Sequence, residues 1–306
     1  MLSVFSLVVG IIGAVALFLF SVISFGKEIK NAAGYHIKSF LSHITSNPVK
    51  GVIFGAISTA ILQSSSATSV LIASLADTGM ISFYNTLGLI FGVNIGTTIT
   101  SQLVAFDAMS VSPFIILFGL LIHFWGNGFK KYGKTIIYFG LLFFSIYLIS
   151  LLTSRVDQEL LGSFLSITSN PFVAILIGVL ASIVFQSSSV VSGIVLVLVG
   201  LGHIDLAQSV GLILGANIGT TSTVIIASMT MGKEAKKVAL SHFMFNFLGV
   251  LILLPFLGFF YKIVQYFDGD IVHQVANIHL IFNLACAFIF LLAIKPFSIL
   301  INRIIK

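Results

Sequence analysis

The sequence predicts an all-α polytopic membrane protein with two inverted repeats, each containing a re-entrant helical hairpin and a broken transmembrane helix. Of the 306 residues, 58% are hydrophobic and only 8% are charged, so the charges are too few to cover a soluble globule. The apolar stretches are long enough for helices, and they lack the alternating pattern of an outer-membrane barrel. Three polar motifs also occur twice at a constant offset, which indicates internal duplication.

The duplicated motifs are TSNP, QSSS and NIGTT. Their two copies begin at Thr45 and Thr168, at Gln63 and Gln186, and at Asn94 and Asn217. The differences 186 − 63 and 217 − 94 both give 123, so the repeat keeps its register without a gap. Polar groups are costly inside a membrane segment and tend to be functional there.

Long apolar stretches bounded by charged residues or by Pro and Gly predict the transmembrane spans. The first stretch, Met1 to Phe25, lacks the basic start of a signal peptide and is expected to be a retained helix. The spans are expected at residues 2–25, 82–106, 112–128, 134–152, 206–230, 237–264 and 275–300.

Two shorter paired segments, 48–76 and 171–200, predict the hairpins. Each arm has about 10 to 15 residues, whereas a bilayer needs about 20. The QSSS motif lies between the arms and therefore forms the tip. Pro48 and Pro171 fall in the first turn of the first arm, where a missing N–H does no harm. We therefore expect both hairpins to enter the membrane and return to the same side.

Basic residues predict the sidedness of the chain. Two of them, Arg155 and Lys262, fall on one face, and thirteen fall on the other, which is therefore expected to be cytoplasmic. The N-terminus is then outside, the C-terminus is inside, and the protein is a multi-pass component of the cell membrane. The thirteen are Lys27, Lys30, Lys38, Lys50, Lys130, Lys131, Lys134, Lys233, Lys236, Lys237, Lys295, Arg303 and Lys306.

The number of spans between the hairpins predicts their relative orientation. Three full spans separate them, and an odd number inverts the second copy. We expect repeats at 1–128 and 129–266 and an additional transmembrane helix within 267–306. Inverted repeats with broken helices near the midplane are typical of secondary transporters. Because the bases lie in short loops, nucleic acid is not an expected partner.

Each QSSS tip offers donors suited to an anion. A turn inside the membrane frees backbone N–H groups, which join three hydroxyls and the N-terminus of the following helix. Ser69 and Ser192 extend this polar face by about one turn. The predicted substrate-binding residues are Gln63, Ser64, Ser65, Ser66, Ser69, Gln186, Ser187, Ser188, Ser189 and Ser192.

The NIGTT tracts suit a hard cation such as sodium. Two nearby glycines are expected to break helices 82–106 and 206–230 and expose backbone carbonyls. The side-chain candidates are Asn94, Thr97, Thr98, Asn217, Thr220 and Thr221. Neither polar tract contains Lys, Arg or His, so a buried anion calls for cations that enter with it. The structural alternative is that the hydroxyls bond to their own helices and the glycines serve packing.

A third pattern, HxxFN, occurs twice near the C-terminus. His242 and Asn246 lie four residues apart, as do His279 and Asn283, so each pair shares one helix face. Interhelical hydrogen bonds that fix packing are the expected role. A proton-sensitive or substrate-lining role for His279 and Asn283 is the weaker alternative. Cys286 is expected to be a small core residue.

The paired QSSS segments, each followed by GxNIGTT, resemble the type II sodium/phosphate cotransporter family. The resemblance covers about Thr45 to Asn283 and includes the tail segment from Ala276 to Asn283. It implies that the two QSSS tracts bind phosphate and sodium between two inverted hairpins. The long extracellular loop of animal members and the PhoU-like domain of many bacterial members are not expected here.

The combined prediction is a sodium-coupled symporter of inorganic phosphate that works by alternating access, with sodium as the coupling ion and no other cofactor. Alternatives in the same class are transport of another small oxyanion or carboxylate, and phosphate export. A channel or a non-transporting membrane subunit is the alternative of another class. An enzyme is not expected, because the serines have no His/Asp partner positioned by sequence and no metal-ligand cluster occurs. A homodimer is left open.

Overall fold

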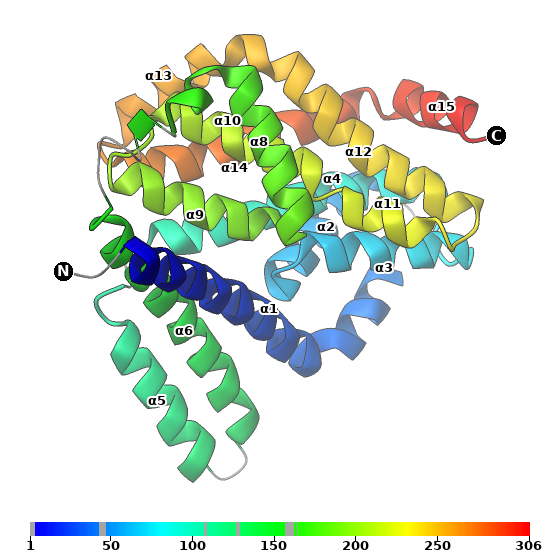
Figure 1. The fold of residues 1–306 in the computed structure, drawn as a ribbon. Helices are drawn as coiled ribbons and strands as arrows, with labels where there is room; N and C mark the ends of the chain where they lie inside the picture. The colour runs from blue at the N-terminus through cyan, green and yellow to red at the C-terminus, as the bar shows by residue number, and fades with distance from the viewer. Residues whose placement is uncertain (1–3, 43–46, 107–108, 127–128, 157–161, 164) are drawn as a thin grey trace.

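The computed structural model describes residues 4–42, 47–106, 109–126, 129–156, 162–163 and 165–306. All regular elements in these ranges are helices (Figure 1). Thr45 and the predicted boundary after residue 128 lie outside the described residues. The first half contains α1 (Val4–Ser42), α2 (Pro48–Leu62), α3 (Ser65–Asp77), α4 (Phe83–Ala105), α5 (Ser112–Trp125) and α6 (Lys130–Thr153).

The second half repeats the order of a helical hairpin followed by a long apolar helix. It contains the 3-10 helix η1 (Ser166–Ser169), α8 (Pro171–Phe185), α9 (Ser188–Gly200), α10 (Leu206–Gly219), α11 (Ser222–Ser228), α12 (Lys233–Leu253), the 3-10 helix η2 (Leu254–Phe256), α13 (Leu257–Phe267), α14 (Ile271–Leu292) and α15 (Ile294–Ile304). In each half the first hairpin arm packs along the long helix, α2 on α4 and α8 on α10.

Six helical segments in the described ranges are long and apolar enough to cross a membrane, which confirms an all-α multi-pass membrane protein. They are Phe5–Ile29, Phe83–Ala105, Tyr132–Thr153, Leu206–Ser228, Lys233–Phe267 and Ile271–Leu292. The hairpin arms α2, α3, α8 and α9 have 15 or 13 residues each, which is too short to span a bilayer alone.

Three predicted spans differ in the structure. Helix α5 ends at Trp125 after 14 residues, about 21 Å, and packs against α6 in a pair that extends to one side (Figure 1). The predicted span 237–264 is divided by η2, where Pro255 cannot donate a backbone hydrogen bond. The predicted span 275–300 is divided at Ala293, and Pro296 lies in the first turn of α15.

Helix α1 is longer than the predicted first span. It runs without interruption for 39 residues, about 58 Å at the normal helical rise. Lys27 therefore lies within a continuous helix and not in a loop, although the charge distribution had assigned it to the cytoplasmic loops. Phe18 is fully buried and approaches the second hairpin, because a Cβ at Gly193 would lie 2.5 Å from its ring.

Three glycines in and before the first NIGTT tract serve helix packing. A Cβ at Gly88, Gly92 or Gly96 would overlap a carbonyl oxygen of α2, so their spacing of four lets the two backbones approach closely. Helix α4 is continuous from Phe83 to Ala105, and the predicted break in the first copy was wrong. In the second copy α10 ends at Gly219 and α11 begins at Ser222, as predicted.

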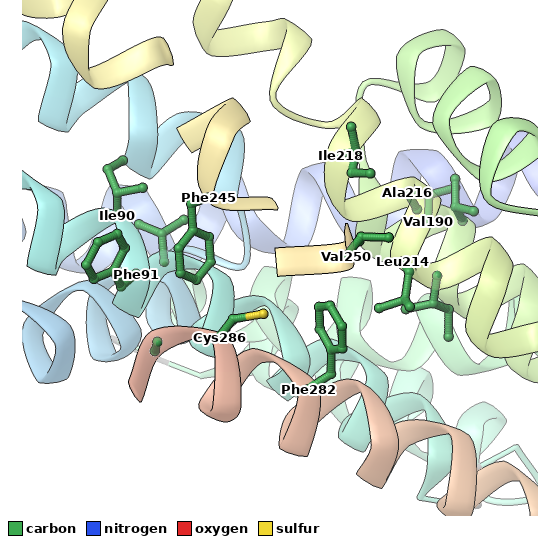
Figure 2. Close-up of a cluster of buried hydrophobic side chains, with 14 of the residues drawn as sticks. Ile90, Phe91, Val190, Leu214, Ala216, Ile218, Phe245, Val250, Phe282 and Cys286 are labelled. Atoms are coloured by element: carbon green, nitrogen blue, oxygen red, sulfur yellow. The ribbon is translucent and has the colours of Figure 1, made fainter. Parts of the chain in front are cut away.

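The apolar core lies between the long helices and α14 (Figure 2). Phe91 of α4 stacks on Phe245 of α12 with ring centroids 4.9 Å apart. Phe245 and Phe282 belong to the two HxxFN motifs, and both are buried. Cys286 is buried beside them, as predicted for a small core residue. The core therefore fixes the helices that carry the polar tracts.

Candidate functional site

The two QSSS turns have the same backbone geometry. Gln63 has φ 48° and ψ 30°, and Gln186 has φ 53° and ψ 26°. They are the non-glycine residues with positive φ among the described residues. A left-handed non-glycine residue costs about 1 to 3 kcal/mol and persists where the surrounding structure imposes it. Both copies therefore hold the same strained turn.

The serine after each glutamine caps the following helix. The Ser64 hydroxyl accepts a hydrogen bond from the Ala67 N–H at 3.1 Å, and the Ser187 hydroxyl accepts one from the Val190 N–H at 3.4 Å. Each tip thus joins the C-terminus of one arm to a capped N-terminus of the next. The N-termini of α3 and α9 carry the partial positive charge of the helix dipole.

One cavity of about 450 Å³ brings the two tips together. Seven of the ten predicted substrate-binding residues line it: Gln63, Ser64, Ser65, Ser66, Gln186, Ser187 and Ser189. Its wall is completed by α1 through Val22, Ile23, Gly26 and Lys27. Lys27 is the charged side chain of this lining. The tracts are neutral, as the sequence shows, but the cavity that they form is not.

Each tip also contacts the other copy, at the end of its NIGTT tract or just after it. The Ser66 hydroxyl donates to Thr223 Oγ1 at 3.4 Å and lies 3.4 Å from Thr220 Oγ1. The Ser189 hydroxyl donates to Thr100 Oγ1 at 3.4 Å. Because 189 − 66 and 223 − 100 both give 123, these contacts are equivalent and exchanged between the copies.

Thr100 joins the two tips directly. Its hydroxyl donates to Gln63 Oε1 at 2.9 Å and accepts from Ser189 of the other hairpin. Thr100 and Thr223 were missed by the sequence interpretation, which stopped at NIGTT. The sequence did contain a signal for them, because Thr100 and Thr223 are separated by the repeat offset of 123 residues.

Three of the predicted serines lie outside the cavity lining, behind the tips. Ser69, Ser188 and Ser192 are at most 1% exposed. Their hydroxyls have no hydrogen-bond partner among the described residues, and neither do those of Thr59 and Ser182. Ser69 and Ser192 are equivalent in the two copies, as are Thr59 and Ser182. Unsatisfied buried oxygens are uncommon in proteins, and here they recur at equivalent positions.

The NIGTT side chains divide into two groups. Asn94, Thr97, Thr98 and Thr221 donate to backbone carbonyls three or four residues earlier in the chain, over 2.7 to 2.9 Å. Their oxygens keep free lone pairs. Thr220 and Asn217 instead face other elements, since Thr220 meets Ser66 and Asn217 meets α14. The structure therefore does not gather all six predicted cation ligands in one place.

His279 connects the two copies through α14. Its Nδ1 lies 2.9 Å from Ser101 Oγ on α4, and its Nε2 lies 3.2 Å from Asn217 Oδ1 on α10. These are the interhelical hydrogen bonds expected for a packing role. Asn283 donates to the His279 carbonyl at 2.8 Å, and Asn246 donates to the His242 carbonyl at 3.0 Å.

His242 differs from His279, because neither of its ring nitrogens has a partner in the described part of the chain. In the same part, no group of three His, Cys, Asp or Glu side chains could hold a metal ion.

Comparison with known proteins assigns this arrangement to a family. The model of the Na+/Pi-cotransporter family matches residues 17–151 and again residues 152–293. "Uncharacterized protein YqeW" of Bacillus subtilis is 32% identical over 283 residues, which cover 91% of this chain and 92% of the relative. No solved structure matches.

Two further relatives carry functional names. "Putative inorganic phosphate export protein YjbB" of Escherichia coli is 24% identical over 301 residues, 97% of this chain and 55% of the relative. "Sodium-dependent phosphate transport protein 2B" of Homo sapiens is 36% identical over 139 residues, 42% of this chain and 20% of the relative. The matched region thus covers about half the length of the Escherichia coli relative and a fifth of the human relative.

Proposed function

Because the chain belongs to the Na+/Pi-cotransporter family, we propose that it couples phosphate movement to sodium as a symporter. The observation that carries the proposal is the single cavity lined by both QSSS tips. Two duplicated tips that meet at one cavity supply a shared site that either half can uncover. This is the arrangement that alternating access between inverted repeats requires.

Phosphate binds between the tips in this proposal. The N-termini of α3 and α9 provide partial positive charge, and the Ser65 hydroxyl lies on the cavity wall. The hydroxyls of Ser66 and Ser189 become donors to the anion when they turn away from Thr223 and Thr100. Gln186 presents its amide from the second strained turn. Gln63 lines the same wall, and its amide is held in place by the Ala60 carbonyl and the Thr100 hydroxyl. A small anion can thus receive several hydrogen bonds from groups that the two turns already hold in position.

Sodium binds to neutral oxygens near the tips. The unpartnered hydroxyls behind the tips and the threonine oxygens of the NIGTT tracts are hard ligands, which suit such a cation. Occupying them offsets the cost of leaving buried polar atoms unsatisfied. Coupling follows, because sodium nearby lowers the electrostatic cost of holding a multiply charged anion in the membrane.

Phosphate export is the second candidate, favoured by the name of the Escherichia coli relative. The same cavity serves either direction, since the gradients of sodium and phosphate set the net flux. Measurement of net phosphate flux in vesicles with and without sodium separates the two. Coupled import requires an inward sodium gradient, whereas a sodium-independent exporter moves phosphate out along its own gradient when choline replaces sodium on both sides. Competition by sulfate, arsenate and dicarboxylates defines the anion class.

The proposal is tested by a sodium jump on proteoliposomes that hold the purified protein. We expect labelled phosphate uptake by wild type and no uptake when choline replaces sodium. Ser66→Ala and Ser189→Ala should each lower uptake roughly ten- to hundredfold, the effect of losing a hydrogen bond to a charged group.

The matched control is Ser145→Ala. Ser145 is fully buried on α6 and donates to the Leu142 carbonyl of its own helix, so this variant should transport like wild type. Equal uptake in choline would disprove sodium coupling. Wild-type uptake by both tip variants would disprove the site.

A further inference from the structure

Lys27 lies beside the tip of the first hairpin. Gly26, the preceding residue, is buried, and a Cβ there would lie 2.9 Å from the Leu62 carbonyl oxygen. This close approach holds α1 against the end of α2. Lys27 then contributes to the wall of the cavity that contains both QSSS turns.

The cavity is lined by one basic residue, Lys27, and by no acidic residue. The ion pairs of the described residues join Lys237 to Glu234 and His273 to Asp268, so Lys27 has no carboxylate partner there. Glu28 follows Lys27 in the sequence but points about 100° away around the helix.

Lys27 also lies within an apolar segment. The segment Phe5–Ile29 is long and apolar enough to span a membrane, and α1 continues beyond it to Ser42. Lys27 is exposed and lies two residues before the end of this segment. A long basic side chain near the end of a span extends to a polar region, and the cavity at the QSSS tips is a polar region that Lys27 lines. In the second copy the equivalent position, 27 + 123 = 150, is Ser150. The lysine is therefore an addition to the duplicated site and not part of the repeat.

We propose that Lys27 is the counter-charge that binds the transported anion at the QSSS tips. Its ammonium group donates to a phosphate oxygen while the hydroxyls and helix N-termini hold the others. The inference rests on the proposed phosphate transport and adds a specificity residue to it. A fixed cation favours a multiply charged anion and reduces the share of charge that sodium must offset.

The test compares Lys27→Met, Lys27→Arg and the control Lys262→Gln in proteoliposomes at saturating sodium. Lys262 is exposed on α13 and does not line the cavity. We expect Lys27→Met to raise the KM for phosphate roughly ten- to hundredfold, as the loss of a charged hydrogen bond predicts. Lys27→Arg and Lys262→Gln should stay within about threefold of wild type, since both keep the cavity charge.

Equilibrium binding of labelled phosphate to the detergent-solubilised variants provides a second readout that does not depend on turnover. Loss of affinity in Lys27→Met with retention in Lys27→Arg supports the inference. An unchanged KM in Lys27→Met, or equal losses in both Lys27 variants, overturns it. A wild-type protein that neither binds nor transports phosphate would overturn the proposed function itself.

Discussion

Gln63 and Gln186 show how single residues shape the site. Both adopt a left-handed conformation that glycine would accept without steric cost, yet both positions hold glutamine. The Gln63 amide receives a hydrogen bond from Thr100, which ties the first tip to α4. Both copies keep a glutamine in a strained backbone conformation. This is more consistent with a role for the side-chain amide than with a role in folding.

Gln63→Gly should separate these roles. We expect the free energy of unfolding to stay within about 1 kcal/mol of wild type, because relief of strain offsets the added freedom of the unfolded chain. Phosphate uptake should fall at least severalfold, because the amide is lost. Thermal unfolding in detergent and uptake in proteoliposomes measure the two effects. Uptake at the wild-type rate would show that the amide is not needed.

The pairing of α2 with α4 determines where the first tip lies. Three glycines spaced by four residues remove the side chains that would separate the helices, so the backbones touch along the whole arm. In the second copy Gly215 and Gly219 allow the same close approach of α10 to α8. The position of each tip therefore depends on close contact between an arm and its long helix.

Gly92→Ala should destabilise the protein by about 1 to 3 kcal/mol, the usual cost of overpacking, because its Cβ would overlap the Val52 carbonyl oxygen. Thermal unfolding in detergent measures the change. Gly13→Ala is the matched control, since a Cβ there would meet no atom within 4 Å beyond the neighbouring backbone of α1, and alanine is favoured over glycine in a helix by about 0.5 to 1 kcal/mol. Equal melting temperatures for the two variants would contradict the packing role.

At the scale of the whole molecule, the two copies are linked by exchanged contacts. Ser66 meets Thr223, and Ser189 meets Thr100, so each hairpin lies against the helix of the other half. His279 adds a third link between α4 and α10. Movement of one half relative to the other must alter these contacts, and alternating access is such a movement.

The double variant Ser66→Cys with Thr223→Cys tests this coupling. Oxidation should join the two halves and lower phosphate uptake below the level of the reduced double variant, because the tip could no longer leave the opposite copy. A reductant should return uptake to that level. The two single variants under the same oxidant are the controls. The native Cys286 is buried and should not react. Normal uptake by the cross-linked protein would contradict movement at this contact.

The local features of the site could be predicted from the sequence. Arm lengths, the positions of Pro48 and Pro171 and the duplicated QSSS turns depend on residues close together in the chain, and the structure has α2, α3, α8 and α9 at the expected places. The break in 82–106 was predicted wrongly, because glycine both weakens a helix and permits close packing. Which effect prevails depends on whether another backbone lies alongside.

The sequence by itself determined that this is a duplicated, helical membrane protein with two polar hairpin tips, because hydropathy, proline positions and repeats are properties of contiguous residues. Only the tertiary structure decided which residues line the cavity between the tips, that Thr100 and Thr223 receive the tip serines of the opposite copy, and that Lys27 of α1 lies in the cavity wall. These features join residues far apart in the chain, and packing alone places them together.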